Sequence, residues 1–289
     1  MEVVRAGALT TVQDLGRPGH AHLGVPHSGA LDLPAHRLAN RLAGNAPAAA
    51  TLETTVDGVA LRATGPVSAV VTFVVTGAPC PVRVDGRPAA WGAPVRVPAG
   101  SVLEVGPARS GVRSYVAVRG GFDVPAVLGS RSADLLSGLG PEPLRAGRVL
   151  AVGPPVGPAL AADVLPVPAP PSEVVLPLVP GPRADWFEAG ALGALAGARY
   201  VVSPASNRIG LRTQGPAVRR ARGGELPSEG MVLGAVQVPP DGLPVVFLAD
   251  HPVTGGYPVI GVVPAGSLPA AAQARPGTPL RFAVTTRYE

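Results

Sequence analysis

Short apolar runs separated by glycine and proline set the pattern of this chain. Its 38 glycines and 36 prolines are dispersed as turn residues and form no single low-complexity block. Many β-branched residues in runs of this length, bounded by turn residues, are typical of a β-barrel or sandwich. Val84–Arg87 (VDGR) predicts a hairpin turn. Strands are predicted at 67–76, 81–84, 94–97, 102–105, 114–119, 174–179, 200–202, 231–238, 244–249, 259–263 and 280–284.

Helical patterns are few. The clearest begins after Asp32, a favourable N-cap with Pro34 in the first turn, and ends before Gly44. Ala35, Leu38, Ala39 and Leu42 recur at helical spacing and would share one buried face. Two further helices are predicted, at 184–195 and at 268–274.

A passage rich in proline and poor in polar residues, at 151–182, separates two β-rich halves. The halves also echo each other weakly, because 15–32 and 209–234 both combine a Gly and Arg, a polar loop and a Ser and Gly ahead of an apolar run. We therefore expect a mainly β protein of two units, 1–165 and 172–289, with a few short helices.

The composition indicates a folded, soluble, cytoplasmic protein with no membrane association. Hydrophobic residues make up 46% of 289 positions, enough for a substantial core. The apolar run at 68–78 is about half of the roughly 20 residues that a membrane-spanning helix needs. Cys80 is the only cysteine, so no intrachain disulfide can form and zinc sites with several cysteine ligands are excluded.

The chain contains no lysine, and all 24 basic residues are arginines. This excludes a Walker A phosphate loop, a Schiff-base lysine and a lysine that carries biotin. If ATP or biotin takes part, another chain supplies the lysine. The formal charge is +5, but the densest basic cluster, Arg219–Arg222, has no interleaved aromatic residue. We interpret it as a solvated loop and expect no nucleic-acid partner.

Most of the candidate chemistry lies at 225–261. A predicted strand ends in Asp250 and His251, and the turn that follows contains Gly255 and Gly256, whose backbone N–H groups could approach a carbonyl, carboxylate or phosphate. The alternative is structural, with Asp250 capping a turn and His251 at the surface.

Two further motifs accompany this stretch. Glu225 and Glu229 (ELPSEG) could flank a small polar ligand, move protons or clamp an arginine, or they could be solvated loop residues. Asn207 and Arg208 (SPASNRIGLR) offer donors for an anionic ligand, with an ordinary Asx turn and surface arginines as the alternative.

The segment 10–32 also contains polar residues, but its chemistry is less favourable. His20 and His22 would share a strand face, yet no glutamate or cysteine accompanies them, and we expect no metal site. Ser28 beside His27 lacks the Gly-x-Ser-x-Gly elbow, so serine hydrolase chemistry is not expected.

Taken in order, the motifs resemble a known family over nearly the whole chain. They are TTVQDLGRPGHAHLGVPHSGALD, YVAVRGGFDVPAVLGSRSADL, SPASNRIGLR, ELPSEGMVLGAVQVPPDG and ADHPVTGGYPVIG. They resemble the allophanate hydrolase subunit 2 family, which is also known as the KipI antagonist family and includes the C subunit of 5-oxoprolinase. Its members are similar to the second half of the carboxyltransferase domain of urea carboxylase. The resemblance implies two cyclophilin-like β-barrel units without prolyl isomerase activity.

The resemblance also implies a function. Members usually act with two partners, one KipI-like and one LamB/YcsF-like, as an ATP-dependent 5-oxoprolinase, which opens 5-oxo-L-proline to L-glutamate. The complex would use ATP with Mg²⁺, and no cofactor would be bound covalently to this chain. The alternatives are a biotin-dependent carboxyltransferase component that acts on urea or a related amide, and a non-catalytic antagonist that binds a KipI-like kinase inhibitor.

The family's motif positions select the residues of the expected site. Arg208 would hold the substrate carboxylate or a phosphate, and the Gly255 and Gly256 amides would bind the lactam oxygen. The expected catalytic residues are Asp250, Glu229 and Glu225. The expected substrate-binding residues are Arg208, Asn207, Ser228, His251, Thr254, Gly255, Gly256 and Tyr257.

Overall fold

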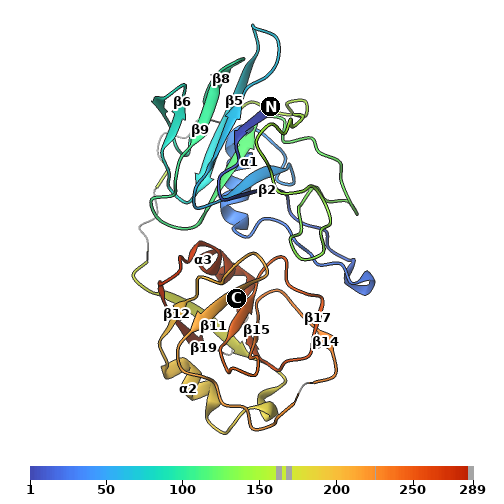
Figure 1. Cartoon of the computed structure of the whole chain (residues 1–289), viewed down its shortest axis with the longest axis vertical. Coiled ribbons are helices and arrows are strands. Elements are labelled where there is room, and N and C mark those ends of the chain that lie inside the picture. The colour runs from blue at the N-terminus through green and yellow to red at the C-terminus, as the bar shows by residue number, and fades with distance from the viewer. Residues whose placement is uncertain (161–164, 167–170, 225, 286–289) are drawn as a thin grey trace. The chain divides into compact units, whose positions relative to one another are not determined.

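The computed structural model describes residues 1–160, 165–166, 171–224 and 226–285, and these form two compact units (Figure 1). The first unit comprises 1–17, 32–134 and 138–170, and the second comprises 18–31, 135–137 and 171–289. The predicted boundaries differ in one respect, because two segments of the N-terminal half, 18–31 and 135–137, belong to the second unit. Hydrogen bonds to Asp250, a residue far away in the sequence, connect these two segments to the second unit.

Ten strands of the first unit form two five-stranded sheets that share one hydrophobic core. One sheet has the order β1 (Glu2–Arg5), β4 (Val59–Arg62), β9 (Val102–Val105), β6 (Val82–Val84) and β7 (Arg87–Ala89). The other has the order β2 (Leu9–Gln13), β3 (Thr51–Thr55), β10 (Arg113–Val118), β5 (Val70–Gly77) and β8 (Val95–Pro98). The hairpin predicted at VDGR is confirmed, because β6 and β7 pair through Val84 and Arg87 around Asp85 and Gly86, both at positive φ.

Helix α1 (Leu33–Ala43) confirms the predicted helix after Asp32. The Asp32 carboxylate accepts a hydrogen bond from the Ala35 N–H at 3.1 Å, and the helix ends at Gly44 in the left-handed conformation, φ 74°. Its buried face lies against the second sheet, where the Thr76 hydroxyl on β5 donates to the Ala35 carbonyl at 2.7 Å. Local capping signals were therefore sufficient to define this element.

His36 on α1 is fully buried, and its ring nitrogens lie 2.9 Å from the Thr51 hydroxyl and 3.1 Å from the Pro47 carbonyl oxygen. Burial lowers the pKa of His36 below its ordinary value of 6.5, and the Pro47 hydrogen bond opposes this shift. Below pH 6.5 the unfolded chain therefore binds a proton that the folded chain does not. The stability contributed by neutral His36 is complete above that pH and is lost as the pH falls below it.

We accordingly expect the free energy of unfolding of the first unit to fall between pH 7 and pH 5, by at most about 1.4 kcal/mol per pH unit from this group. Urea titrations followed by Trp91 fluorescence, in a Trp186→Phe background, would measure it. His36→Gln should flatten the pH dependence, whereas His22→Gln, at an exposed position, should leave it unchanged. Equal slopes in the His36→Gln and parent proteins would contradict this assignment.

Seven strands of the second unit close into a barrel. Their order is β11 (Val174–Pro180), β18 (Val259–Val262), β15 (Ala235–Gln237), β16 (Val245–Phe247), β13 (Gly210–Gln214), β12 (Tyr200–Val202) and β19 (Pro279–Val284). The barrel closes where β11 runs parallel to β19, with Val174 opposite Leu280. Leu176, Val236, Ile260 and Phe282 are fully buried in its core. A further two-stranded ribbon, β14 (Glu229–Gly230) with β17 (Thr254–Gly255), is not part of the barrel ladder (Figure 1).

The mainly β class is confirmed, and the closed barrel forms in the second unit, while the first is built from two sheets. Several predicted elements are shorter than expected, among them the strand at 244–249, of which β16 covers only Val245–Phe247. The helix predicted at 184–195 is a 3-10 turn (Ala184–Trp186) and then α2 (Ala191–Gly197), because Gly190 lies at φ 85°. The strand predicted at 231–238 is only β15, because Gly234, φ 82°, turns the chain just before it.

The remaining helix, α3 (Leu268–Gln273), confirms the third helical prediction within its expected range. Short 3-10 turns also occur at Ala21–Leu23 and Ala265–Ser267. Within the described ranges, no helix combines the length and the apolar character that a membrane crossing requires.

Candidate functional site

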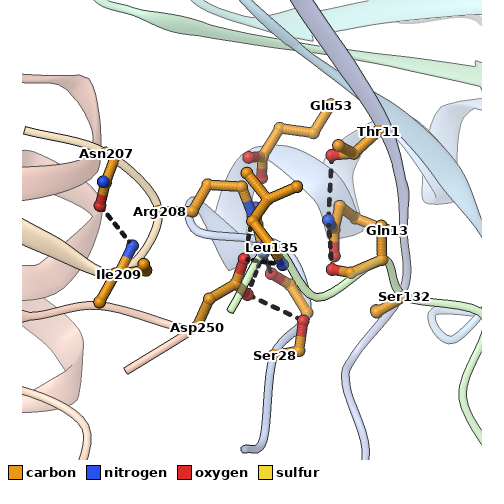
Figure 2. A network of polar contacts seen from close by, with 12 residues as sticks. Thr11, Gln13, Ser28, Glu53, Ser132, Leu135, Asn207, Arg208, Ile209 and Asp250 are labelled. Carbon is orange, nitrogen blue, oxygen red and sulfur yellow. Dashed lines mark hydrogen bonds and ion pairs between the residues drawn. The ribbon is translucent and has the colours of Figure 1, made fainter. Parts of the chain in front are cut away.

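Arg208 and Asp250 form a buried bidentate ion pair in the second unit (Figure 2). The Arg208 Nε donates to Asp250 Oδ2 at 2.8 Å, and Nη2 donates to Oδ1 at 2.9 Å. The two side chains are 1% and 0% exposed. Asp250 lies three residues past β16, and Arg208 lies just before β13, the strand that pairs with β16. Neighbouring strands of the barrel therefore bring the pair together.

The same carboxylate accepts two more hydrogen bonds from distant segments. The Ser28 hydroxyl donates to Oδ1 at 2.9 Å, and the Leu135 N–H donates to Oδ2 at 3.1 Å (Figure 2). Arg208 also donates to the Gly29 carbonyl at 2.7 Å, and the Ser28 N–H donates to the Ala249 carbonyl at 3.0 Å. These hydrogen bonds therefore help to attach 28–29 and 135 to the barrel.

Ser28 adopts the left-handed conformation, φ 55°, which is unfavourable for a residue with a side chain. The surrounding hydrogen bonds hold it there. Its hydroxyl donates to the buried Asp250 carboxylate.

These contacts bear on two expected roles. Arg208 was expected to hold a substrate carboxylate, but its bidentate face is occupied by Asp250. Asp250 was expected to move protons, but its two oxygens accept four hydrogen bonds and have no solvent exposure. A carboxylate so placed stabilises the fold of this unit, and its expected part in proton transfer stays a prediction.

The β14–β17 ribbon brings the ELPSEG and TGGY motifs together, as the sequence suggested. Glu229 lies opposite Gly255, and the Leu226 N–H donates to the Gly256 carbonyl at 2.8 Å. The Met231 N–H donates to the Val253 carbonyl at 2.8 Å, which makes that pair a hydrogen-bonded one. Because such pairs alternate in an antiparallel ladder, Glu229 and Gly255 form the next hydrogen-bonded pair.

The expected role of the two glycine amides is therefore reduced to one. The Gly255 N–H belongs to the ladder, whereas no residue in the described part of the chain accepts a hydrogen bond from the Gly256 N–H. Gly255 is required for a different reason, since a Cβ there would lie 2.8 Å from the Gln237 side-chain nitrogen and 3.3 Å from Met231. The Gln237 amide in turn donates to the Tyr257 carbonyl at 3.2 Å and fixes the end of the ribbon.

Glu229 is bound by an arginine that the sequence did not single out. Arg183, which follows β11, donates from Nε to Glu229 Oε2 at 3.0 Å and from Nη2 to Oε1. The side chains are 37% and 30% exposed, so the carboxylate remains accessible. The suggestion that this loop clamps an arginine is confirmed. The only signal was the motif's acidic character, because 46 residues separate the partners.

The other expected residues divide into structural and exposed groups. Asn207 accepts from the Ile209 N–H at 2.8 Å and from the Gly210 N–H at 3.3 Å, which confirms the Asx-turn alternative. His251 is buried, stacks on Phe247 with ring centroids 5.7 Å apart, and has Nδ1 2.7 Å from the Pro252 carbonyl oxygen. Its expected role in substrate binding stays a prediction. Ser228 and Thr254 are exposed, and Glu225 lies outside the described residues.

Other features of the second unit lie elsewhere. Hollows of about 330 Å³ and 190 Å³ adjoin Glu188 and 217–219, and no candidate residue lines either of them. In the described part of the chain, no three His, Cys, Asp or Glu residues are grouped as metal ligands would be. The ribbon, with Glu229, the Gly256 N–H and the exposed hydroxyls of Ser228 and Thr254, is thus the accessible polar site that the sequence motifs define.

The fold and these motifs define a mainly β module of the carboxyltransferase class. Residues 23–284 match the family model described as carboxyltransferase domain, subdomain A and B. The chain belongs to this family.

Curated relatives carry two kinds of name. The chain is 36% identical to the C subunit of 5-oxoprolinase from Escherichia coli, over 98% of this chain and 90% of that protein. It is 32% identical to the corresponding 5-oxoprolinase protein of Haemophilus influenzae, over 100% and 92%. It is also 33% identical to urea amidolyase of Lachancea kluyveri, over 97% of this chain but only 17% of that protein.

Solved structures agree with the fold. The crystal structure of TTHA0988 has a TM-score of 0.85 and 38% identity, over 98% of this chain and 55% of that chain. The Kluyveromyces lactis urea amidolyase has a TM-score of 0.86 and 31% identity, over 97% and 18%. The chain thus spans about half of TTHA0988 and less than a fifth of the amidolyase.

Proposed function

We propose that this chain is the C subunit of an ATP-dependent 5-oxoprolinase, which opens 5-oxo-L-proline to L-glutamate together with a KipI-like partner and a LamB/YcsF-like partner. The proposal rests on the share of each relative's length that this chain matches. The Escherichia coli 5-oxoprolinase protein matches this chain over nearly the full length of both, whereas the amidolyases match it as a small part of a much longer chain. The match to nearly all of a 5-oxoprolinase subunit therefore supports this activity over that of the amidolyases.

The reaction adds water across the lactam C–N bond. The carbonyl carbon gains an oxygen, the bond to nitrogen breaks, and the nitrogen takes a proton to become the amino group of glutamate. Hydrolysis of ATP to ADP and phosphate accompanies this opening. The chemistry requires a donor for the lactam oxygen and a group that moves a proton.

The ribbon offers both groups. In the proposed complex, the Gly256 N–H donates to the lactam oxygen as negative charge develops on it. Glu229 moves the proton, because two bonds to Arg183 leave lone pairs on its carboxylate for another partner. The hydroxyls of Ser228 and Thr254 orient the substrate. Glu225, four residues before Glu229, remains a second candidate from the sequence.

ATP with Mg²⁺ is assigned to one of the two partner proteins. The chain has no lysine and hence no Walker A loop, and the arginines of the ribbon region are occupied: Arg183 by Glu229 and Arg208 by Asp250. Arg183 and Arg208 therefore do not fit a site for a nucleoside triphosphate. We assign the proposed complex to the cytoplasm, where ATP is supplied.

The test is reconstitution. The chain is purified and mixed with the KipI-like and LamB/YcsF-like partners from the same source, and glutamate release from 5-oxoproline is measured with and without ATP. We expect release only when all three proteins and ATP are present, and omission of any one should abolish it. Tight binding to the KipI-like partner without turnover in any combination would overturn the proposal and favour the antagonist function.

A second candidate is a biotin-dependent carboxyltransferase component, favoured by 33% identity to urea amidolyase over 97% of this chain. The biotinyl lysine would belong to another chain. Carboxyl transfer from a carboxybiotinylated carrier to urea, measured in the absence of the two 5-oxoprolinase partners, distinguishes the two functions. Transfer to urea with no release of glutamate from 5-oxoproline would replace the first proposal with this one.

A further inference from the structure

One short segment, 183–188, holds both ends of the loop that leads into the ribbon. At the start of that loop, the Glu188 N–H donates to the Arg219 carbonyl at 3.2 Å, and the Ala221 N–H donates to the Trp186 carbonyl at 2.9 Å. The guanidinium carbons of Arg220 and Arg222 lie 5.8 Å and 6.0 Å from the centroid of the Trp186 ring. Two arginines of the cluster 219–222, interpreted from the sequence as a solvated loop, thus lie over the Trp186 ring.

Glu229 lies at the far end of the loop. Within the described part of 183–188, Arg183 is the residue that binds its side chain. Both carboxylate oxygens are engaged by one planar guanidinium, which fixes the rotation and the position of the carboxylate together. A single point contact, such as a lysine would make, fixes only the position. The pair therefore determines where the free lone pairs of Glu229 point.

The exposure of the pair argues against stability as its main effect. With 37% and 30% of the two side chains exposed, an isolated ion pair of this kind contributes little to folding. A ribbon of two residues per strand is also marginal by itself. Without Arg183, only backbone bonds and the Gln237 amide would hold the ribbon, which would open locally more often, and the Glu229 side chain would have no fixed orientation.

We propose that Arg183 is the positioning residue of this site: its guanidinium holds the Glu229 carboxylate in the orientation needed to exchange a proton with the amide substrate. The inference rests on the proposed function of Glu229. Arg183 itself need not touch the substrate, and it acts through Glu229 and the ribbon.

The test compares Arg183→Met and Arg183→Lys in the full complex with both partner proteins. Because a displacement of about 1 Å can reduce a rate about 100-fold, we expect Arg183→Met to lower kcat by about 10- to 100-fold with little change in the KM for 5-oxoproline. Arg183→Lys should recover only part of the loss. In the background of Glu229→Gln, Arg183→Met should cause no further loss. A full additional loss in that background would overturn the proposal.

A matched control exists in the same unit. Arg281 on β19 pairs with Glu173 through Nε at 2.9 Å, with exposures of 45% and 30% that resemble those of the Arg183 pair. Arg281→Met should leave kcat unchanged. Equal effects of Arg183→Met and Arg281→Met on kcat would show that only a general surface effect had been measured and would overturn the proposal.

A second measurement does not depend on activity. Hydrogen exchange of the isolated chain reports the ribbon through the Leu226 and Met231 N–H groups, which donate across it. Arg183→Met should speed exchange at both by several-fold, without a shift of the unfolding midpoint, and Arg281→Met should not. Unchanged exchange would overturn the positioning inference even if the complex were active. If the unmodified complex released no glutamate, the proposed function would fail, and faster exchange would still support the Arg183 clamp.

Discussion

Replacing Asp250 by asparagine is expected to lower the free energy of unfolding of the second unit by about 3–5 kcal/mol. The substitution keeps the shape of the side chain but removes its charge, and it leaves the Arg208 guanidinium buried without a counter-ion. It also sets the asparagine NH₂ group against at least one donor from Arg208, Ser28 or Leu135. A buried charge that loses its partner costs far more than the pair contributes when it is intact.

The two tryptophans make this measurable for one unit at a time. Trp91 lies in the first unit and Trp186 in the second, so urea unfolding of a Trp91→Phe protein, followed by fluorescence, reports the second unit through Trp186. Asp241→Asn is the matched control, because Asp241 is exposed and its side chain accepts from the Leu243 N–H. We expect a change below about 0.5 kcal/mol for it. Arg208→Met combined with Asp250→Asn should cost less than the sum of the two single substitutions.

A loss below about 1 kcal/mol for Asp250→Asn would refute the structural assignment of this pair. The measurement also bears on function. If Asp250→Asn reduces activity only in proportion to the unfolded fraction, the residue supports the fold. If the folded variant is inactive, Asp250 takes part in the chemistry itself.

How far the sequence predicts this molecule depends on the range of the interactions involved. The helix that begins at Asp32 and the VDGR hairpin were correct because capping groups and turn residues lie within a few positions of the elements they define. The prediction of one continuous helix at 184–195 was wrong. It followed the alanine and leucine residues, but the left-handed backbone conformation of Gly190 interrupts the helix. Local patterns predict local structure, and they fail where one residue of unusual φ overrides the pattern.

The candidate site illustrates the other limit. The motifs that form the ribbon were recognised, but the partners of their charged side chains were not. Ser28 and Asp250 are 222 positions apart, and Arg183 and Glu229 are 46 apart. No spacing rule connects such positions, because only the closed barrel brings them together. The sequence predicted the same role for Asp250 and Glu229. Their burial differs, because the Asp250 side chain is fully buried and the Glu229 side chain is 30% exposed.

Of these two carboxylates, Glu229 is therefore expected to carry the larger catalytic effect. In the reconstituted complex, Glu229→Gln should lower kcat for 5-oxoproline by about 10²–10⁴-fold, the usual contribution of a general acid or base. Glutamine has nearly the same shape and its carbonyl can still accept one hydrogen bond from Arg183, but it cannot exchange a proton at neutral pH. The KM should change little, because binding of the lactam oxygen is assigned to the Gly256 N–H.

Steady-state glutamate release, at saturating ATP and varied 5-oxoproline, separates kcat from KM for this variant. Glu173→Gln is the matched control, since Glu173 also pairs with an arginine, Arg281, and has the same 30% exposure, but lies just before β11. It should retain full activity. A decrease of less than about threefold for Glu229→Gln would remove Glu229 from the chemistry. The proton transfer would then pass to Glu225 or to one of the partner proteins, and the ribbon would be left with a binding role through Gly256, Ser228 and Thr254.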